Sequence, residues 1–252
     1  MEVSQAQVSE QGRTVRMELA DVCFAIEGRD IIGNLSFVCD RKRVGIVGRN
    51  GSGKSTLARL IAGLVAPVSG SIRVGGLNLA KDRRAALAEV GMIFQNPDHQ
   101  IIFPTVAEEL SFGLRQIGFS AVDAQSEVRS VLGKFQVAHW EEAYISNLSA
   151  GQKHLVCLMA VVAMMPRLVI LDEPFAGLDV PTRMQLERYL AGYDGALLHI
   201  THDPRDIAEY DEVVWIDQGK VKDQGPPARI LPAYLAEMKK LGERDDISEL
   251  SG

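Results

Sequence analysis

Apolar and polar residues alternate near the start of the chain, and this two-residue period is typical of a strand with one buried face. Residues 17–26 and 31–38 both show the alternation, and Gly28 marks a turn between them. A turn of this kind between two such segments favours antiparallel pairing. The pattern therefore predicts an antiparallel β layer at the beginning of the fold.

Later apolar runs lack the alternation, as expected for strands that are buried on both faces of a parallel sheet. These runs are residues 43–47, 90–94, 168–171 and 196–200. Shorter strands are predicted at residues 71–74, 213–216 and 220–223. Between the strands, apolar residues recur at helical spacing. Helices are predicted at residues 56–62, 83–89, from 106, and at 122–135, 155–165, 182–190, 206–210 and 228–241.

This order of elements predicts one α/β domain over residues 17–241. Its parts are a parallel core sheet, an N-terminal antiparallel β layer and a helical subdomain at about residues 96–150. Residues 1–16 are polar and lack periodicity, so we expect a flexible leader. Residues 242–252 are charged, and we expect a mobile tail.

Composition narrows the classes of function. The 252 residues carry a net charge of −6, which argues against a general nucleic-acid binder. The three cysteines are far apart and lack the paired spacing of a metal site, which favours free thiols in a reducing compartment. The longest apolar run, residues 155–165, is too short to cross a bilayer. Any association with a membrane must therefore occur through another chain.

A glycine-rich stretch carries the most specific chemistry. Residues 48–55 read G-x-x-x-x-G-K-S, the spacing of a phosphate-binding P-loop (Walker A), between a predicted strand and a predicted helix. Glycines let the backbone N–H groups turn inward around phosphate oxygens, and the helix N-terminus adds partial positive charge. A glycine-rich turn that binds nothing is the alternative. The candidate nucleotide-binding residues are Gly48, Asn50, Gly51, Ser52, Gly53, Lys54, Ser55 and Thr56.

Two further motifs have weaker signals. Asp172 and Glu173 end an apolar strand, where a P-loop protein places an acid near Mg²⁺ and a residue that positions water. A solvated pair of acids at a strand end is the alternative. Residues 148–152 read Leu-Ser-Ala-Gly-Gln before a predicted helix. By composition alone, the sequence favours Ser149 as an ordinary helix N-cap over Ser149 as part of an anion site.

Taken in order, the motifs resemble the nucleotide-binding domain of ABC ATPases. The order is the Walker A motif, Gln95, residues 148–152, residues 168–173, residues 176–179 and His202. The resemblance implies ATP hydrolysis with Mg²⁺ bound near Ser55, Gln95 and Asp172. It also implies that Glu173 is the general base or positions the attacking water.

The resemblance assigns further roles. Gln95 corresponds to a glutamine that reaches Mg²⁺ and the attacking water. Ser149 and Gly151 correspond to signature residues that bind the γ-phosphate of ATP held by a second protomer. Asp179 corresponds to an aspartate at the dimer interface. His202 corresponds to a switch histidine that contacts the γ-phosphate, and a satisfied surface histidine is its alternative.

Three positions depart from the family pattern. Ala150 replaces a glycine, and we expect it to be tolerated because it is small. His154 and Leu155 stand where a polar residue and an arginine are usual, which predicts altered contacts behind the signature. The aromatic residue that usually stacks on adenine would fall at Ile26, while Phe24 is expected to face the core.

The stretch after Gln95 narrows the family. Residues 96–100 read Asn-Pro-Asp-His-Gln, which resembles the ATPases of energy-coupling factor (ECF) importers. That resemblance implies a second ATPase protomer (this chain or a paralogue), a transmembrane coupling subunit and a membrane substrate-binding subunit. It implies a peripheral position on the cytoplasmic face of the cell membrane. The imported substrate would be a vitamin such as biotin, or cobalt or nickel.

Two other classes of function are weighed against transport. A soluble ABC ATPase acting in translation or DNA repair usually has two cassettes or a long coiled-coil insert, and the sequence shows neither. A non-catalytic regulatory subunit would be expected to lack Glu173 or His202, and both are present.

Overall fold

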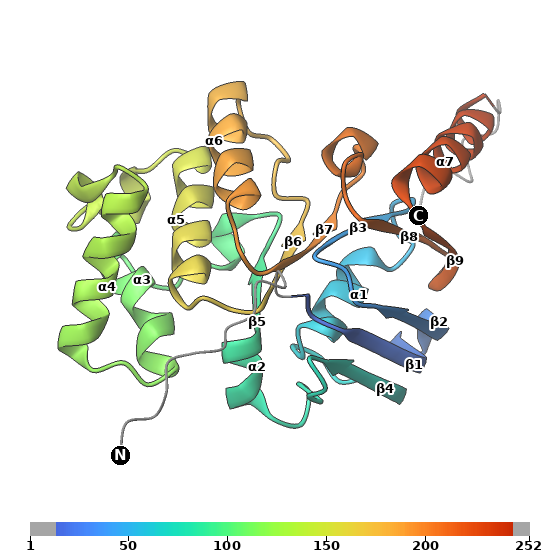
Figure 1. Ribbon diagram of the computed structural model, residues 1–252, viewed down its shortest axis with the longest axis horizontal. Coiled ribbons are helices and arrows are strands. Elements are labelled where there is room, and N and C mark those ends of the chain that lie inside the picture. Colours follow the sequence, from blue (N-terminus) through green and yellow to red (C-terminus); the bar gives the residue numbers. More distant parts are fainter. Residues whose placement is uncertain (1–13, 244–252) are drawn as a thin grey trace, which may run out of the picture.

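The computed structural model describes residues 14–243, which form two β-sheets flanked by helices (Figure 1). The antiparallel sheet has the order β2-β1-β4 and consists of β1 (Met17–Ile26), β2 (Arg29–Cys39) and β4 (Ser69–Val74). The second sheet has the order β5-β6-β7-β3-β8-β9. Its strands are β3 (Arg43–Val47), β5 (Val90–Ile93), β6 (Leu168–Asp172), β7 (Ala196–Ile200), β8 (Glu212–Asp217) and β9 (Lys220–Gly225).

Five neighbouring strands of the second sheet, from β5 to β8, run parallel, and β9 pairs antiparallel with β8. The predicted parallel core sheet and N-terminal antiparallel layer are thus confirmed. Of the predicted leader and tail, residues 1–13 and 244–252 lie outside the described residues. Val15, within the predicted leader, is fully buried in the core.

Burial explains why the core strands read as unbroken apolar runs. Every residue of β6 and β7 is buried. Leu168 and Ile170 face one core, which also contains the apolar side of α1 (Lys54–Ile61), whereas Val169 and Leu171 face the other. Both faces of these strands are therefore covered, as a parallel sheet requires.

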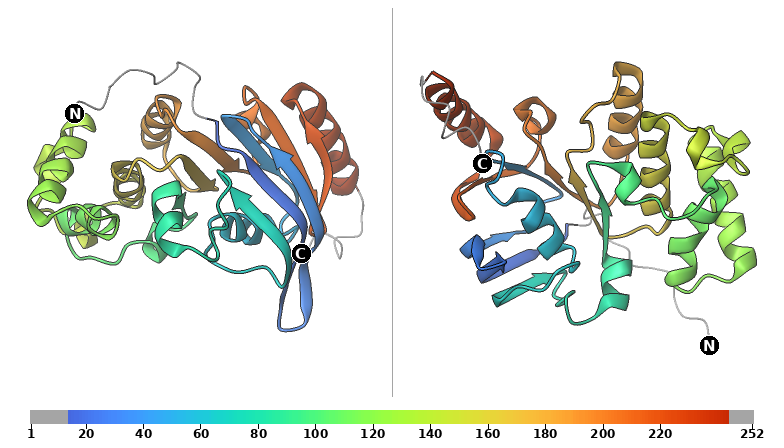
Figure 2. Two further views of the ribbon diagram at one scale, coloured as in Figure 1. Left: turned by 60° about the horizontal axis from the view of Figure 1, so that its bottom comes forward. Right: turned by 180° about the vertical axis from the view of Figure 1, so that it is seen from behind.

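The remaining helices cover the sheets or extend away from them. The predicted helical subdomain contains α3 and α4, which lie at the end of the molecule opposite the antiparallel sheet (Figures 1 and 2). The helix α5 joins them to the core sheet, since it packs against α3, α4 and β5. The bounds are α2 (Arg83–Glu89), α3 (Val106–Gln116), α4 (Ala121–Lys134), α5 (Ala150–Ala163), α6 (Val180–Ala191) and α7 (Pro227–Gly242).

Local hydrogen bonds explain where two important helices begin. The helix α3 starts after Thr105, whose side chain and that of Glu108 form a reciprocal capping box. Thr105 is therefore the N-cap of α3. Ser149 and Gln152 form the same arrangement at the start of α5. Such boxes satisfy backbone donors that a helix N-terminus leaves without partners.

The predicted helix at residues 206–210 is wrong in type and position. The structure has a 3₁₀ turn at Pro204–Ile207 instead. The Asp203 side chain accepts a hydrogen bond from the backbone N–H of Arg205, and Pro204 lacks an N–H of its own. These features start the turn earlier than apolar spacing indicates. Within the described chain, no helix is long and apolar enough to cross a membrane.

Gly91 determines how closely β5 and α5 approach. A Cβ atom at Gly91 would lie 2.4 Å from Val161 Cγ1 and 3.0 Å from Pro166 Cγ. We expect Gly91→Ala to lower the free energy of unfolding by about 1–3 kcal/mol, because overpacking a dense core is unfavourable. Urea unfolding measures this change.

Gly133, near the end of α4, is the matched control because no atom lies within 4 Å of an added Cβ. Gly133→Ala should raise the free energy of unfolding by roughly 0.5–1 kcal/mol, since alanine favours helix. A Gly91→Ala protein as stable as wild type would contradict the close packing of β5 on α5.

Candidate functional site

The glycine loop of residues 48–53 joins the end of β3 to the start of α1. Gly51 and Gly53 have φ values of 75° and 99°, in the left-handed region that glycine adopts without strain. Gly48 has a different reason to be glycine: an added Cβ would lie 2.3 Å from Ile216 O and 2.7 Å from Ser52 Oγ. The helix predicted at residues 56–62 begins earlier, at Lys54, and Gly53 is its left-handed N-cap.

Lys54 lies folded against this loop. Its Nζ donates hydrogen bonds to Gly48 O at 2.8 Å and Arg49 O at 2.9 Å. Burial lowers the pKa of Lys54, and the charges of Glu173 and Asp172 partly oppose that shift. Ser52 Oγ is buried and has no hydrogen-bond partner among the described residues. A buried cation and an unused hydroxyl in a glycine cradle fit a phosphate group.

The hydroxyl group of Ser55 and the carboxylate of Asp172 lie close together near Lys54. Ser55 Oγ donates to Asp172 Oδ1 at 3.1 Å, and Asp172 is 5% exposed. Burial raises the pKa of Asp172, whereas the Ser55 hydrogen bond and the charges of Arg59 and Lys54 lower it. No cluster of three potential metal-binding side chains occurs in residues 14–243. One hydroxyl and one carboxylate fit Mg²⁺, which usually completes its shell with water and substrate phosphates.

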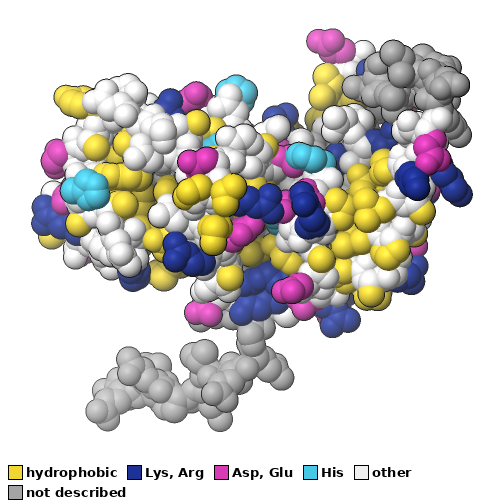
Figure 3. Space-filling view, turned by 90° about the horizontal axis from the view of Figure 1, so that it is seen from above, with side chains coloured by type: hydrophobic (Ala, Val, Ile, Leu, Met, Phe, Trp, Pro, Cys, Tyr) yellow, Lys and Arg dark blue, Asp and Glu magenta, His cyan; other side chains and the backbone are white. Residues whose placement is uncertain are grey.

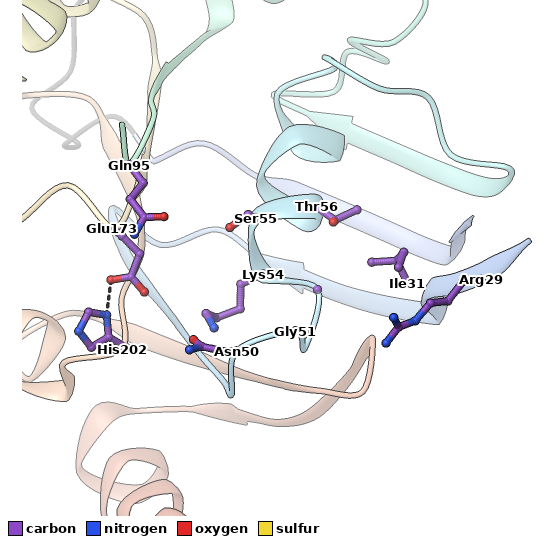
Figure 4. Close-up of a pocket in the computed structure, with 11 residues that line it drawn as sticks. Arg29, Ile31, Asn50, Gly51, Lys54, Ser55, Thr56, Gln95, Glu173 and His202 are labelled. Atoms are coloured by element: carbon purple, nitrogen blue, oxygen red, sulfur yellow. Dashed lines mark hydrogen bonds and ion pairs between the residues drawn. The ribbon is translucent and has the colours of Figure 1, made fainter. Parts of the chain in front are cut away.

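Glu173 and His202 form a hydrogen-bonded pair, with 2.6 Å between Glu173 Oε2 and His202 Nδ1 (Figure 4). They follow β6 and β7, which are adjacent and parallel, with Asp172 opposite Ile200. Glu173 has a φ of 52°, unusual for a residue with a side chain, while its N–H donates to Ile200 O at 3.0 Å. Such strain recurs at functional sites, where the surrounding structure holds it in place.

These residues surround one cavity of ≈ 700 Å³. Figure 4 shows Gln95, Glu173 and His202 at one end, Lys54 between, and Arg29 with Ile31 at the other. The cavity is thus built from ends of strands far apart in sequence. Its lining includes the predicted site residues Asn50, Gly51, Gly53, Lys54, Ser55, Thr56, Gln95, Glu173 and His202.

Sequence reasoning missed Arg29 and Ile31, which lie on β2 at the end of the cavity away from the catalytic pair. The structure pairs Arg29 with Ile26 across the turn at Gly28, and no motif in the sequence indicates this pairing. Ile26 is exposed, and Phe24 packs against the core as predicted.

The predicted residues Gly48, Ser52 and Asp172 adjoin the residues that line this cavity, whereas the signature residues and Asp179 lie elsewhere. Ser149 and Asp179 line a separate cavity of ≈ 370 Å³ together with Trp140 and Tyr189. The Asp179 side chain accepts a hydrogen bond from the N–H of Thr182 at 3.0 Å, which lowers the pKa of Asp179. Gly151 packs so closely on α6 that an added Cβ would lie 2.8 Å from Thr182 Cγ2. One chain therefore holds two separate groups of candidate residues.

His154, behind the signature, contacts the backbone of both the signature and the segment that carries Gln95. It is 3% exposed, and its ring nitrogens lie 3.1 Å from Ala150 O and 3.2 Å from Gln95 O. Lys153, the preceding residue, forms a 2.7 Å ion pair with Asp98. The start of α5 is thus tied to the segment that carries Gln95.

A glycine cradle between a buried strand and a helix, with two acidic residues at the end of another strand of the same parallel sheet, defines a P-loop nucleoside triphosphatase. Comparison with known proteins gives the family. The family model described as ABC transporter matches residues 33–176. The biotin transport ATP-binding protein BioM of Rhodobacter capsulatus is 42% identical, over 89% of this chain and 96% of that protein.

Two further comparisons agree. The energy-coupling factor transporter ATP-binding protein EcfA1 of Lacticaseibacillus paracasei is 32% identical, over 92% of this chain and 85% of that protein. The structure of cbiO1 from Clostridium perfringens, part of the ABC transporter complex cbiONQ, has a TM-score of 0.73 and 26% identity. It covers 91% of this chain and 95% of that chain. The chain belongs to the ABC transporter family as an ATPase of the energy-coupling factor type.

The buried carboxylate of Asp172 gives a prediction with opposite effects on stability and activity. At neutral pH, burial disfavours the ionised form, so we expect Asp172→Asn to raise the melting temperature of the nucleotide-free protein. The same change should lower Mg²⁺ affinity at least about 10- to 100-fold, because a ligating oxygen loses its charge. Thermal unfolding without Mg²⁺ and Mg²⁺ titration of ATP hydrolysis measure the two effects.

The effect on stability should depend on pH. The pKa of Asp172 is higher in the folded state than its ordinary value of 3.8, so protonation on acidification relieves the penalty. The advantage of Asp172→Asn is fully present above the folded-state pKa and shrinks as pH falls through it. An advantage that grows on acidification would contradict this account.

Proposed function

We propose that the cavity between Arg29 and His202 binds ATP, with the triphosphate on the glycine loop. The backbone N–H groups of that loop cradle the phosphates, and Lys54 leaves the carbonyl groups it now contacts to bind the β- and γ-phosphates. The support is the cavity lining, which presents Asn50, Gly51 and Lys54 along one continuous wall (Figure 4). Ser55, Asp172 and Gln95 are the residues that would hold Mg²⁺, which when bound neutralises phosphate charge.

In this proposal Glu173 orients the attacking water and accepts its proton. The hydrogen bond from His202 fixes one carboxylate oxygen, which leaves the other to face the water. His202 is well exposed, and it contacts the γ-phosphate from the edge of the cavity. Gln95, at the same end of the cavity, completes the arrangement around the attacking water.

We further propose that two protomers form each complete site. Ser149 and Asp179 do not line the cavity that contains Lys54, so a single chain leaves the outer side of the γ-phosphate open. Ser149 and Gly151 of the partner subunit would cover it, with Asp179 at the interface. ATP then stabilises a closed pair because it contacts both protomers only in that state.

For transport, we propose that this pair drives import of biotin or a closely related vitamin. The observation that carries this proposal is the 42% identity to the biotin transport ATP-binding protein BioM of Rhodobacter capsulatus. The pair would bind a transmembrane coupling subunit at the cytoplasmic face of the membrane, and a separate membrane subunit would bind the vitamin. On the face in Figure 3, Lys and Arg side chains are interspersed with Asp and Glu, unlike a nucleic-acid interface.

Mixing two inactive variants tests whether sites form between protomers. Lys54→Ala removes the central cation, and Ser149→Arg blocks the signature. Each variant should hydrolyse almost no ATP alone. Mixed in equal amounts, they should recover roughly a quarter of wild-type activity, because half of the dimers are mixed and each of these has one intact site.

Ser120→Arg is the matched control for loss of a helix cap. Ser120 caps α4 as Ser149 caps α5, but Ser120 does not line the cavity that contains Ser149 and Asp179. We expect Ser120→Arg to remain active with a modestly lower melting temperature. A mixture of the two inactive variants that stays inactive, while wild type hydrolyses ATP, would rule out sites built from two copies of this chain.

Reconstitution with the co-expressed membrane subunits tests the transported substrate. We expect ATP-dependent uptake of labelled biotin, and little uptake of Co²⁺ or Ni²⁺. Glu173→Gln should bind ATP but reduce uptake by at least about 100-fold, as expected for loss of a general base. Uptake of a metal ion in place of biotin would refute the vitamin assignment, and failure to bind any membrane subunit would favour a soluble ABC ATPase.

A further inference from the structure

Arg183, in the first turn of α6, contacts three parts of the molecule at once. Its Nη2 donates to Asp206 Oδ1 at 2.5 Å, and its Nε donates to Glu187 Oε1 at 2.8 Å. Its guanidinium carbon lies 5.1 Å from the ring centroid of Phe175, two residues after Glu173. This side chain therefore joins α6 to the segments that follow both β6 and β7.

The carboxylate of Asp206 extends the connection to the catalytic histidine. Its side chain is only 4% exposed, and its Oδ2 accepts a hydrogen bond from Thr201 Oγ1 at 2.8 Å. Thr201 immediately precedes His202, and its N–H donates to Ile46 O at 3.2 Å. The position of His202 thus depends on a buried carboxylate whose counter-ion comes from α6.

The other end of the connection is the signature side of the chain. Arg183 N donates to Asp179 O at 3.0 Å, so the first turn of α6 carries both residues. Thr182 in that turn packs against Gly151. A shift of the surface formed by Ser149, Gly151 and Asp179 therefore moves the backbone that bears Arg183.

We propose that the Arg183–Asp206 ion pair couples the two ATP half-sites of one protomer. One half-site contains Ser149 and Asp179 and faces the partner's nucleotide; the other contains Glu173 and His202. This inference rests on the proposed two-protomer sites. Nucleotide held against Ser149 shifts the start of α6, and Arg183 carries Asp206, Thr201 and His202 with it. Packed elements shift between discrete arrangements, so a small displacement is transmitted.

Arginine suits this position better than lysine. Its planar fork reaches Asp206 and Glu187 through different nitrogens while its face lies over Phe175. An ammonium group is a single point charge and cannot make all three contacts. Arg183→Lys should therefore fold, retain a cation near Asp206 and couple the half-sites only in part.

ATP hydrolysis by the full-length chain, measured over a range of ATP concentrations, tests the coupling. Wild type should give a Hill coefficient above 1, as expected for two interacting sites. Arg183→Gln and Asp206→Asn should each bring the coefficient to 1 and lower kcat about 5- to 100-fold. The double variant should be no worse than either single one, because both changes break the same connection.

Two measurements separate coupling from structure. Binding of a fluorescent ATP analogue to dilute protein should change less than about twofold in these variants, since neither side chain lines the ATP cavity. Glu187→Gln, which removes only the more exposed partner of Arg183, should keep the wild-type Hill coefficient. Arg183→Lys should give a Hill coefficient between those of wild type and Arg183→Gln. If the Arg183→Gln protein does not fold, Arg183→Lys takes its place in the test.

The outcomes are distinguishable. Arg183→Gln or Asp206→Asn proteins that melt at a lower temperature but keep the wild-type Hill coefficient would overturn the coupling and leave a structural ion pair. A wild-type coefficient of 1 would overturn it as well. In either case, recovery of activity on mixing Lys54→Ala with Ser149→Arg would still support the proposed two-protomer sites, so the two proposals fail separately.

Discussion

The parallel pairing of β3, β6 and β7 is the constraint on which the site depends. The carboxyl ends of parallel strands lie at one edge of a sheet, so the loops that follow these strands meet there. The register places Asp172 opposite Ile200, and Thr201 N–H donates to Ile46 O. Side chains separated by more than a hundred residues in sequence are brought into one cavity by backbone hydrogen bonds alone.

The same sheet also explains why the signature residues lie elsewhere. Ser149 and Asp179 sit at the N-termini of α5 and α6, and these helices precede and follow β6. Both of these helices begin at the edge of the sheet, but at some distance along that edge from the glycine loop. The fold thus places Ser149 and Asp179 on a surface separate from the glycine cradle, and this separation is what the proposed two-protomer site uses.

Much of this arrangement was predictable from sequence because it depends on local patterns. Unbroken apolar runs identified the buried strands, and the spacing of Gly48 to Ser55 identified the cradle. Contacts between distant segments were not predictable in this way. Nothing in the neighbourhood of Arg183 indicates that Asp206 is its partner, and the pairing of Arg29 with Ile26 needed the turn geometry.

Two further differences between the predicted and the observed structure lie at Glu173 and at residues 206–210. The left-handed backbone of Glu173 follows from a tertiary hydrogen bond to Ile200 O, which no local pattern records. Residues 206–210 carry helical spacing, yet Asp203 and Pro204 direct the chain into a 3₁₀ turn. At Glu173 a tertiary contact overrides local preference, whereas at residues 204–207 the local effects of Asp203 and Pro204 override the apolar spacing.

The electrostatics of the nucleotide-free site indicate why ligand binding changes the molecule. Burial lowers the pKa of Lys54 and raises the pKa of Asp172, so the fold disfavours the charged form of both groups. Phosphate would add negative charge beside Lys54, beyond that of Glu173 and Asp172, and a divalent cation would add positive charge beside Asp172. A ligand that relieves both penalties would bind the folded protein in preference to the unfolded chain and stabilise it by mass action.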